Sequence, residues 1–117
     1  MPYADPRARL EDILEAIREI EGFASGRTFQ DYLDQGWLRF ATQRGIEIVS
    51  EASRRIPADL KARHSEIPWA DIAGIGNIIR HGYDSLDHAV IWGVVENDLP
   101  PLKAAVEAML REVRGRK

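Results

Sequence analysis

Cysteine is absent from this chain of 117 residues, so a disulfide framework, thiolate metal ligands and a cysteine nucleophile are all excluded. Aromatic residues make up only 8% of the sequence, and no apolar run approaches the length that crosses a membrane. Basic residues are in deficit, with a net charge of −3, which disfavours broad binding to nucleic acid. Because the first residues also lack a signal-peptide layout, we expect a cytoplasmic protein without membrane association.

Helical periodicity is present along nearly the whole chain, which we expect to form one domain over residues 1–117. The pattern predicts helices over residues 6–22, from the N-cap Thr28 to just before Pro57, over 58–64 and over 68–81. A fifth helix is expected after a cap at Ser85 or Asp87, and a last one from residues 98–101 onward. The fifth should bury Val90, Ile91, Val94 and Val95. The fold class is therefore all-α, an antiparallel up-and-down bundle of four main helices plus short ones.

Residues 77–83 bring an amide, a guanidinium, an imidazole and a phenol into one short segment. Histidine is the side chain whose ordinary pKa lies near neutral pH, so it can both take and give a proton there. Asn77 and His81 are four residues apart on the predicted helix, and Asn77 and Arg80 are three apart. Such neighbours can address one small volume, while Tyr83 follows just beyond the end of the helix.

These residue types suit RNA cleavage without a metal, for which a base, a cation and an acid are enough. His81 would act as base or acid, Arg80 as the cation and Asn77 as an orienting hydrogen-bonding group. The residue pattern alone favours a purely structural role, because a histidine at a helix C-terminus stabilises the helix dipole. We expect no cofactor and no metal, since the spacing of His64, His81 and His88 gives no reason for them to meet.

The chain resembles the HepT-like branch of the HEPN superfamily. The resemblance is carried by residues 67–75, which begin Ile67-Pro68-Trp69, by Asn77, His81 and Tyr83, and by residues 9–14, 44–52 and 91–102. It covers nearly the whole chain.

This resemblance implies a helical homodimer that acts as the toxin of a prokaryotic toxin–antitoxin system. Such toxins are metal-independent ribonucleases whose site, at the dimer interface, is an arginine followed four to six residues later by a histidine. Their partner is a MntA-like nucleotidyltransferase antitoxin, which nucleotidylates a tyrosine two residues after the histidine. By position, His81 would be the catalytic histidine, Tyr83 the modified residue and Asn77 the polar residue that follows the arginine.

The sequence departs from this pattern at Gly76, which stands where the arginine is expected. Arg80 is a candidate substitute, although it neighbours His81 and therefore points about 100° away around the helix. It could instead serve the second protomer's site across a two-fold axis. The alternative function is a catalytically silent binding module that docks to a nucleotidyltransferase or positions its substrate.

Charged residues on the preceding long helix have two interpretations. Arg44 and Glu51 lie near its apolar stripe, and Glu47 follows Arg44 by three residues. They could form a polar network that supports the helix carrying His81. They could also form an intrahelical ion pair at the edge of the core, of modest energetic value.

Overall fold

A computed structural model describes residues 5–115, apart from the side chain of Tyr83. Every regular element in that range is helical. In chain order these are α1 (Pro6–Ala24), α2 (Phe29–Asp34), α3 (Gly36–Ser53), α4 (Ala58–Ala62), α5 (Trp69–His81), the 3₁₀ turn η1 (Tyr83–Ser85), α6 (His88–Gly93), the π-helical segment η2 (Val94–Asp98) and α7 (Leu99–Arg114). Among the helices of residues 5–115, none is long and apolar enough to span a bilayer.

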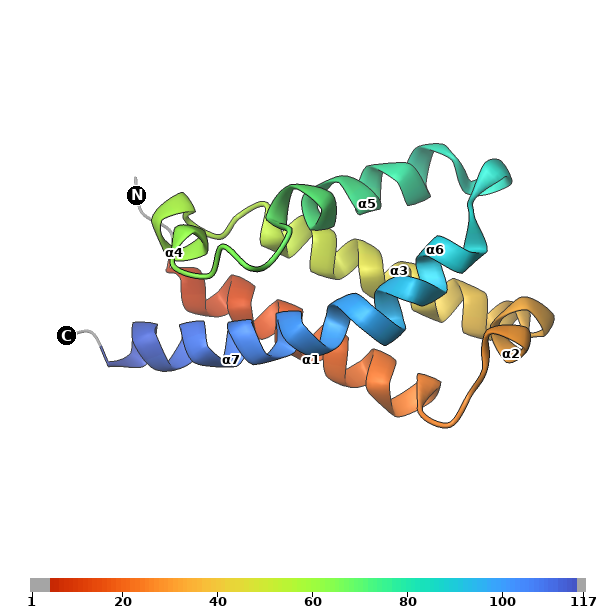
Figure 1. Cartoon of the computed structure of the whole chain (residues 1–117), viewed down its shortest axis with the longest axis horizontal. Coiled ribbons are helices and arrows are strands. Elements are labelled where there is room, and N and C mark those ends of the chain that lie inside the picture. The colour runs from red at the N-terminus through yellow and green to blue at the C-terminus, as the bar shows by residue number, and fades with distance from the viewer. Residues whose placement is uncertain (1–4, 116–117) are drawn as a thin grey trace.

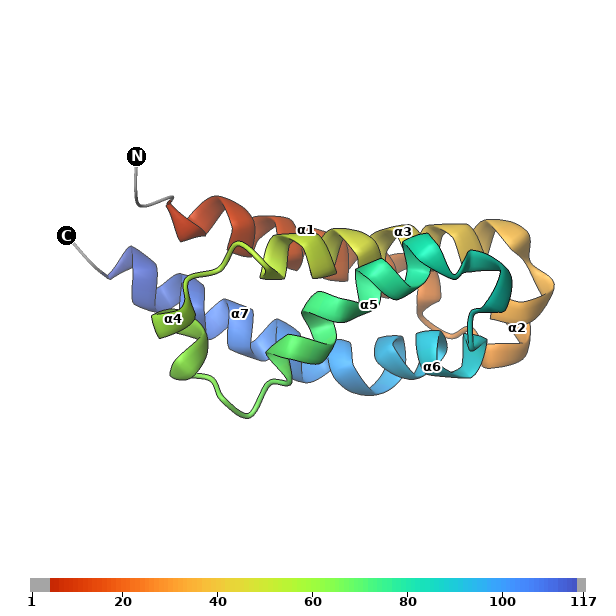
Figure 2. The same cartoon turned by 90° about the horizontal axis from the view of Figure 1, so that it is seen from above.

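The long helices form an antiparallel bundle, as the sequence predicted (Figure 1). Helix α1 packs against α3 and α7, and α3 also packs against α5. Helix α1 begins and α7 ends at one end of the bundle, whereas α2 and the α5–α6 connection lie at the other (Figure 2). The α5–α6 connection therefore lies at the α2 end of the molecule.

The amphipathic stripes predicted from the sequence form the core. Ile13, Ile17 and Ile20 of α1 are fully buried, as are Leu102 and Met109 of α7. Burial of side chains of this size stabilises the fold by about 1.5–3 kcal/mol each. This spacing fixes which face of each helix turns inward.

The predicted long helix after Thr28 is in fact two helices. Thr28 is an N-cap, as expected, and forms a capping box with Asp31. The chain then breaks at Gln35, whose backbone is extended (φ −114°, ψ 108°), and α3 begins at Gly36. A glycine costs up to about 1 kcal/mol in a helix interior, so the break places Gly36 at a helix start instead.

The fifth and last predicted helices are joined, because α6, η2 and α7 follow one another without a break. Asp87 caps α6, as expected, by accepting from the amides of Ala89 and Val90. The expectation that Val90 is buried is wrong: its side chain is 52% exposed, whereas that of Trp92 is 3% exposed. Val90 borders a hollow between α5 and the α6–α7 helix, described below.

Candidate functional site

Helix α5 carries the candidate residues and is held against α3 along one side. Its buried residues are Ile72, Gly76 and Ile79, which recur at helical spacing. The helix ends where predicted, at His81, and the amide of Gly82 donates to the carbonyl of Ile78 at 3.0 Å. Arg80 and His81 lie in the last turn, where the helix dipole favours positive charge.

Ser50 of α3 occupies the space in front of Gly76. The Gly76 amide donates to Ser50 Oγ at 3.1 Å, and Ser50 Oγ donates to the Ala73 carbonyl at 3.0 Å. A Cβ atom at position 76 would lie 2.6 Å from Ser50 Oγ and 2.9 Å from Ser50 Cβ. Both distances are below ordinary van der Waals contact, so only glycine fits at position 76 while serine is at position 50.

Arg80 folds back along α5 toward this same position. Its Nη1 atom lies 3.8 Å from where a Cβ at position 76 would stand, and its Nη2 donates to Asn77 Oδ1. The structure therefore brings Asn77 and Arg80 together, as their spacing predicts. The guanidinium lies beside the point from which the expected arginine side chain would start.

His81 and Asn77 are both exposed. No hydrogen bond or ion pair joins His81 to Asn77 or Arg80 within residues 5–115. Tyr83 begins η1, two residues after His81. Its side chain, on which the modification was predicted, lies outside the described residues. Chain geometry alone thus places His81 next to the Asn77–Arg80 pair.

Arg80 also lines an open polar hollow of about 310 Å³ beside α1 and α3, which we call the polar hollow. Its other lining residues are Arg9, Asp12, Arg44, Glu47, Ile48, Glu51, Ala52 and Arg55. Arg9 pairs with Asp12 at 3.4 Å, and Arg55 pairs with Glu51 at 3.4 Å. No ion pair joins Arg44 to Glu47 in the part of the chain that the structure describes, so that interpretation of Arg44 is wrong.

A second arginine, which the sequence pattern did not single out, also contacts α5. Arg54, which follows α3, donates to the carbonyl of Ala73 from Nε at 3.1 Å and from Nη2 at 2.7 Å. Position 54 carries no motif, and only the packing of α3 on α5 brings it there. Together with Ser50 it fixes the register of the two helices.

On the side of α5 away from Gly76 lies a hollow of about 420 Å³, which we call the apolar hollow. It runs between α5 and the α6–α7 helix, and its lining includes Ile75, Ile78, Val90, Val94, Leu99 and Leu102. Ile78 is 59% exposed and Val90 is 52% exposed. A single chain therefore leaves apolar side chains uncovered on α5 close to His81, since Ile78 precedes His81 by three residues.

The other two histidines are engaged elsewhere. His64 Nε2 lies 2.7 Å from Glu112 Oε2, and His88 Nδ1 lies 2.9 Å from the hydroxyl of Tyr32. Hydrogen bonds from His64 and Arg63 lower the pKa of the Glu112 carboxyl. Burial raises the pKa of the Tyr32 phenol above its ordinary value, which already lies well above neutral pH. No group of three or more potential metal-ligating side chains gathers within the described residues.

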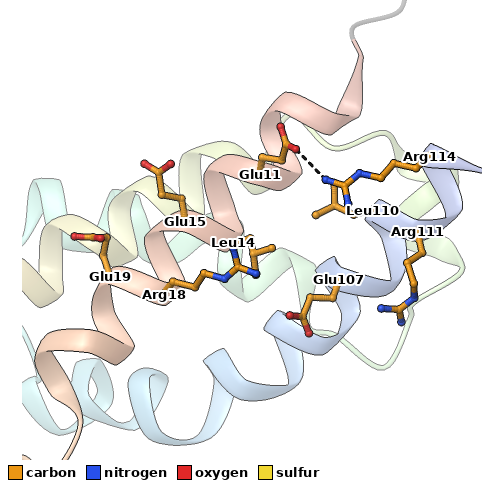
Figure 3. A pocket seen from close by; sticks show the side chains of 9 residues that line it. All are labelled: Glu11, Leu14, Glu15, Arg18, Glu19, Glu107, Leu110, Arg111 and Arg114. Atoms are coloured by element: carbon orange, nitrogen blue, oxygen red, sulfur yellow. Dashed lines mark hydrogen bonds and ion pairs between the residues drawn. The ribbon is translucent and has the colours of Figure 1, made fainter.

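A larger hollow, of about 820 Å³, lies between α1 and α7 (Figure 3). It is lined by Glu11, Leu14, Glu15, Arg18, Glu19, Glu107, Leu110, Arg111 and Arg114. Arg114 pairs with Glu11 across it at 3.1 Å. Its charges are of both signs and solvated, and α5 does not contribute to it. We therefore place the candidate site at α5 and not in this larger hollow.

Comparison with known proteins identifies the family to which the chain belongs. The model of the family described as "Ribonuclease HepT-like" matches residues 13–109. A Thermococcus cleftensis protein named "Probable ribonuclease HepT" is 42% identical over 100 residues, covering 86% of this chain and 91% of that protein. A Methanocaldococcus jannaschii protein named "Putative RNase MJ1380" is 33% identical over 107 residues, covering 92% of this chain and 98% of the relative. No solved structure matches the chain significantly.

Proposed function

The chain belongs to the HepT-like ribonuclease family, and on this premise we propose that it is a metal-independent endoribonuclease, the toxin of a toxin–antitoxin pair. One observation supports an active enzyme more than any other. The Arg80 guanidinium lies 3.8 Å from the Cβ position of residue 76, where the sequence pattern expects an arginine. Arg80 would thus supply from position 80 the charge that Gly76 cannot.

The proposed reaction is attack of an RNA 2′-hydroxyl on the adjacent phosphate of the backbone. His81 takes the proton of that hydroxyl, or gives one to the departing 5′-oxygen. The 2′-oxygen forms a bond to phosphorus while the bond to the 5′-oxygen breaks. Arg80, held by Asn77, stabilises the extra negative charge on the phosphorane oxygens, a contribution typically worth about 3–4 kcal/mol.

We further propose that a second copy completes the cleft. The exposed Ile78 and Val90 and the apolar hollow beside α5 support this arrangement, because apolar surface of this kind is normally covered. A two-fold axis near α5 would bring His81 of one copy toward the Asn77–Arg80 pair of the other. The site, open in one chain, would then become a cleft.

We propose that a MntA-like nucleotidyltransferase is the antitoxin and modifies Tyr83. In such a transfer the phenol oxygen bonds to the α-phosphorus of a nucleoside triphosphate, and pyrophosphate leaves. The added phosphodiester would place a negative charge two residues from His81. This charge would repel the RNA phosphate and pair with the Arg80 guanidinium. Both effects are expected when a modification adds negative charge to an anion-binding site.

The test is cleavage of a labelled RNA by purified protein in the presence of EDTA, compared with His81→Ala. We expect wild type to cleave, and the variant to lose at least about a hundred-fold in rate, the usual contribution of a general acid or base. Added imidazole should restore part of the loss. Equal cleavage by the two proteins would contradict the proposal.

The second candidate function is a catalytically silent module that docks to a nucleotidyltransferase or positions its substrate. The observation in its favour is Gly76 itself, closed off by Ser50. An inert, nontoxic wild type that gains cleavage when an arginine is accommodated at position 76 would support it. Growth arrest on expression of wild type would support the enzyme.

A further inference from the structure

Two aromatic side chains on α3 are exposed to an unusual degree. Phe40 is 71% exposed and Trp37 is 50% exposed. Aromatic residues of this size are mostly covered in folded proteins, so an exposed pair is informative. They are three residues apart and therefore neighbours on one side of α3, which we call the aromatic patch. The aromatic patch lies in the first turns of α3, at the end of the bundle that also holds α2 and the α5–α6 connection (Figure 2).

Arginines flank the aromatic patch on both sides. The Arg27 guanidinium stands over the Trp37 ring at 5.0 Å from its centroid. Arg44 follows Phe40 by four residues, one helical turn, and lines the polar hollow together with Arg80. In the described part of the chain, Arg44 and Arg80 are the two arginines of that hollow that form no ion pair. The lining of the polar hollow holds four arginines and three carboxylates, those of Asp12, Glu47 and Glu51, so a small excess of positive charge lies between the aromatic patch and the candidate site.

We propose that this surface of α3 binds single-stranded RNA. An unpaired base stacks on Phe40, the adjoining phosphate contacts Arg44, and the strand continues to Arg80 and His81. Stacking on aromatic side chains combined with cations along the backbone is how proteins hold single strands without reading sequence. The inference rests on the proposed ribonuclease function and adds to it how the substrate is held.

The charges favour RNA over a second copy of the chain as the occupant. The acidic side chains Asp12, Glu15 and Glu19 border the α1 side of α3. Arg44 lines the same groove between α1 and α3, and Asp12 also lines the polar hollow. These carboxylates would repel a phosphate backbone from the groove, so we expect the strand to follow Arg44 and Arg80 on the side of the polar hollow. The apolar hollow differs, because its charged lining residues are Asp71 and Asp98, both acidic. That hollow suits a protein surface, whereas the aromatic patch suits a polyanion with flat, apolar bases.

Substitutions at Phe40 separate stacking from simple apolar contact. Phe40→Leu keeps an apolar side chain but removes the ring face, and Phe40→Trp keeps a ring face. We would measure fluorescence anisotropy of a labelled single-stranded oligouridylate in a His81→Ala background, so that the RNA stays intact. Phe40→Ala and Phe40→Leu should each weaken binding by about ten-fold, the effect of losing one base stack, and Phe40→Trp should bind as tightly as phenylalanine.

Two further readouts complete the test. Arg44→Gln should make the log–log salt dependence of binding shallower by about 0.7, as for loss of one phosphate contact on a single strand. A hairpin duplex of equal length should bind more weakly, because its bases cannot stack on Phe40. Circular dichroism would verify that each variant is folded.

The inference is overturned if Phe40→Ala and Phe40→Leu bind the oligonucleotide as tightly as the parent. It is also overturned if Phe40→Leu binds the oligonucleotide as tightly as the parent while Phe40→Ala lowers the mass measured by sedimentation. That result is expected if Phe40 belongs to an interface between copies of the chain. Cleavage by otherwise unaltered protein separates the two proposals. Cleavage whose KM is unaffected by Phe40→Ala would leave the function standing and remove this inference. Binding that depends on Phe40 without any cleavage would do the reverse.

Discussion

Ser50 Oγ accepts a hydrogen bond from the Gly76 amide at 3.1 Å, and this contact sets how closely α3 and α5 approach. The same serine leaves no room for a side chain at position 76, where its Cβ would lie 2.9 Å from that of Ser50. Serine at one position and glycine at the other therefore form a matched pair. The candidate cation then has to come from elsewhere, and Arg80 is the side chain that reaches the position.

Gly76→Arg alone should destabilise the fold, because overpacking at a close helix contact typically costs about 1–3 kcal/mol. The double variant Ser50→Gly with Gly76→Arg should recover part of that loss by removing the obstructing side chain. Urea unfolding measures both effects.

Gly74→Ala is the matched control in the same helix, because a Cβ there would meet nothing within 4 Å. It should keep or raise stability, by up to about 1 kcal/mol, through helix propensity. If Gly76→Arg were as stable as Gly74→Ala, the matched-pair interpretation would be wrong.

Asn77→Ala should lower kcat for RNA cleavage roughly ten-fold, equivalent to about 1.4 kcal/mol, because Arg80 loses the acceptor that holds it. Asn77→Asp keeps an acceptor but should also lower kcat, since its carboxylate would neutralise the cation. Steady-state kinetics with both variants would verify this. A kcat for Asn77→Ala equal to that of wild type would argue against a role for the Asn77–Arg80 pair.

Tyr32→Phe should destabilise the protein by about 0.5–1.5 kcal/mol for each hydrogen bond lost, because both partners of its hydroxyl are part-buried. The Tyr32 side chain is 0% exposed, and its hydroxyl bonds to His88 and accepts from Gln43 at 3.0 Å. These contacts join α2, α3 and α6. Thermal unfolding would measure the loss, and an unchanged midpoint would mean that water replaces the hydroxyl.

Glu112 should make stability depend on acid pH. Hydrogen bonds from His64 and Arg63 lower its pKa below the ordinary value of 4.5. A lowered folded-state pKa gives stability that is complete above the unfolded-state value and is lost as the pH falls through the folded-state value. The urea midpoint should therefore fall more for wild type than for Glu112→Gln between about pH 6 and pH 3. Parallel curves would contradict this assignment.

The helices and their caps could be predicted because their causes are local. The stripe of Ile13, Ile17 and Ile20 fixes the buried face of α1, and Asp87 caps the next amide groups along the chain. The break at Gln35 could not be predicted, because glutamine is a residue type that helices accept. Its extended backbone is visible only in the structure.

Contacts between distant residues set the rest. The exposure of Val90 depends on how far α5 stands from α6, which no local pattern records. The obstruction of position 76 needs Ser50, 26 residues earlier in the chain. For the same reason, sequence alone could name Arg80 as a substitute cation but could not show that its guanidinium folds back over Gly76.

The most direct measurement is the single-turnover rate of RNA cleavage in EDTA for wild type, Arg80→Ala and Arg114→Ala. Arg114 is the matched control, because it is an exposed arginine that pairs with Glu11 in the α1–α7 hollow. We predict that Arg80→Ala slows cleavage by about a hundred- to a thousand-fold, the usual cost of one transition-state donor, while Arg114→Ala cleaves like wild type. Equal rates for Arg80→Ala and wild type, or no cleavage by wild type, would contradict the claim that Arg80 replaces the missing arginine.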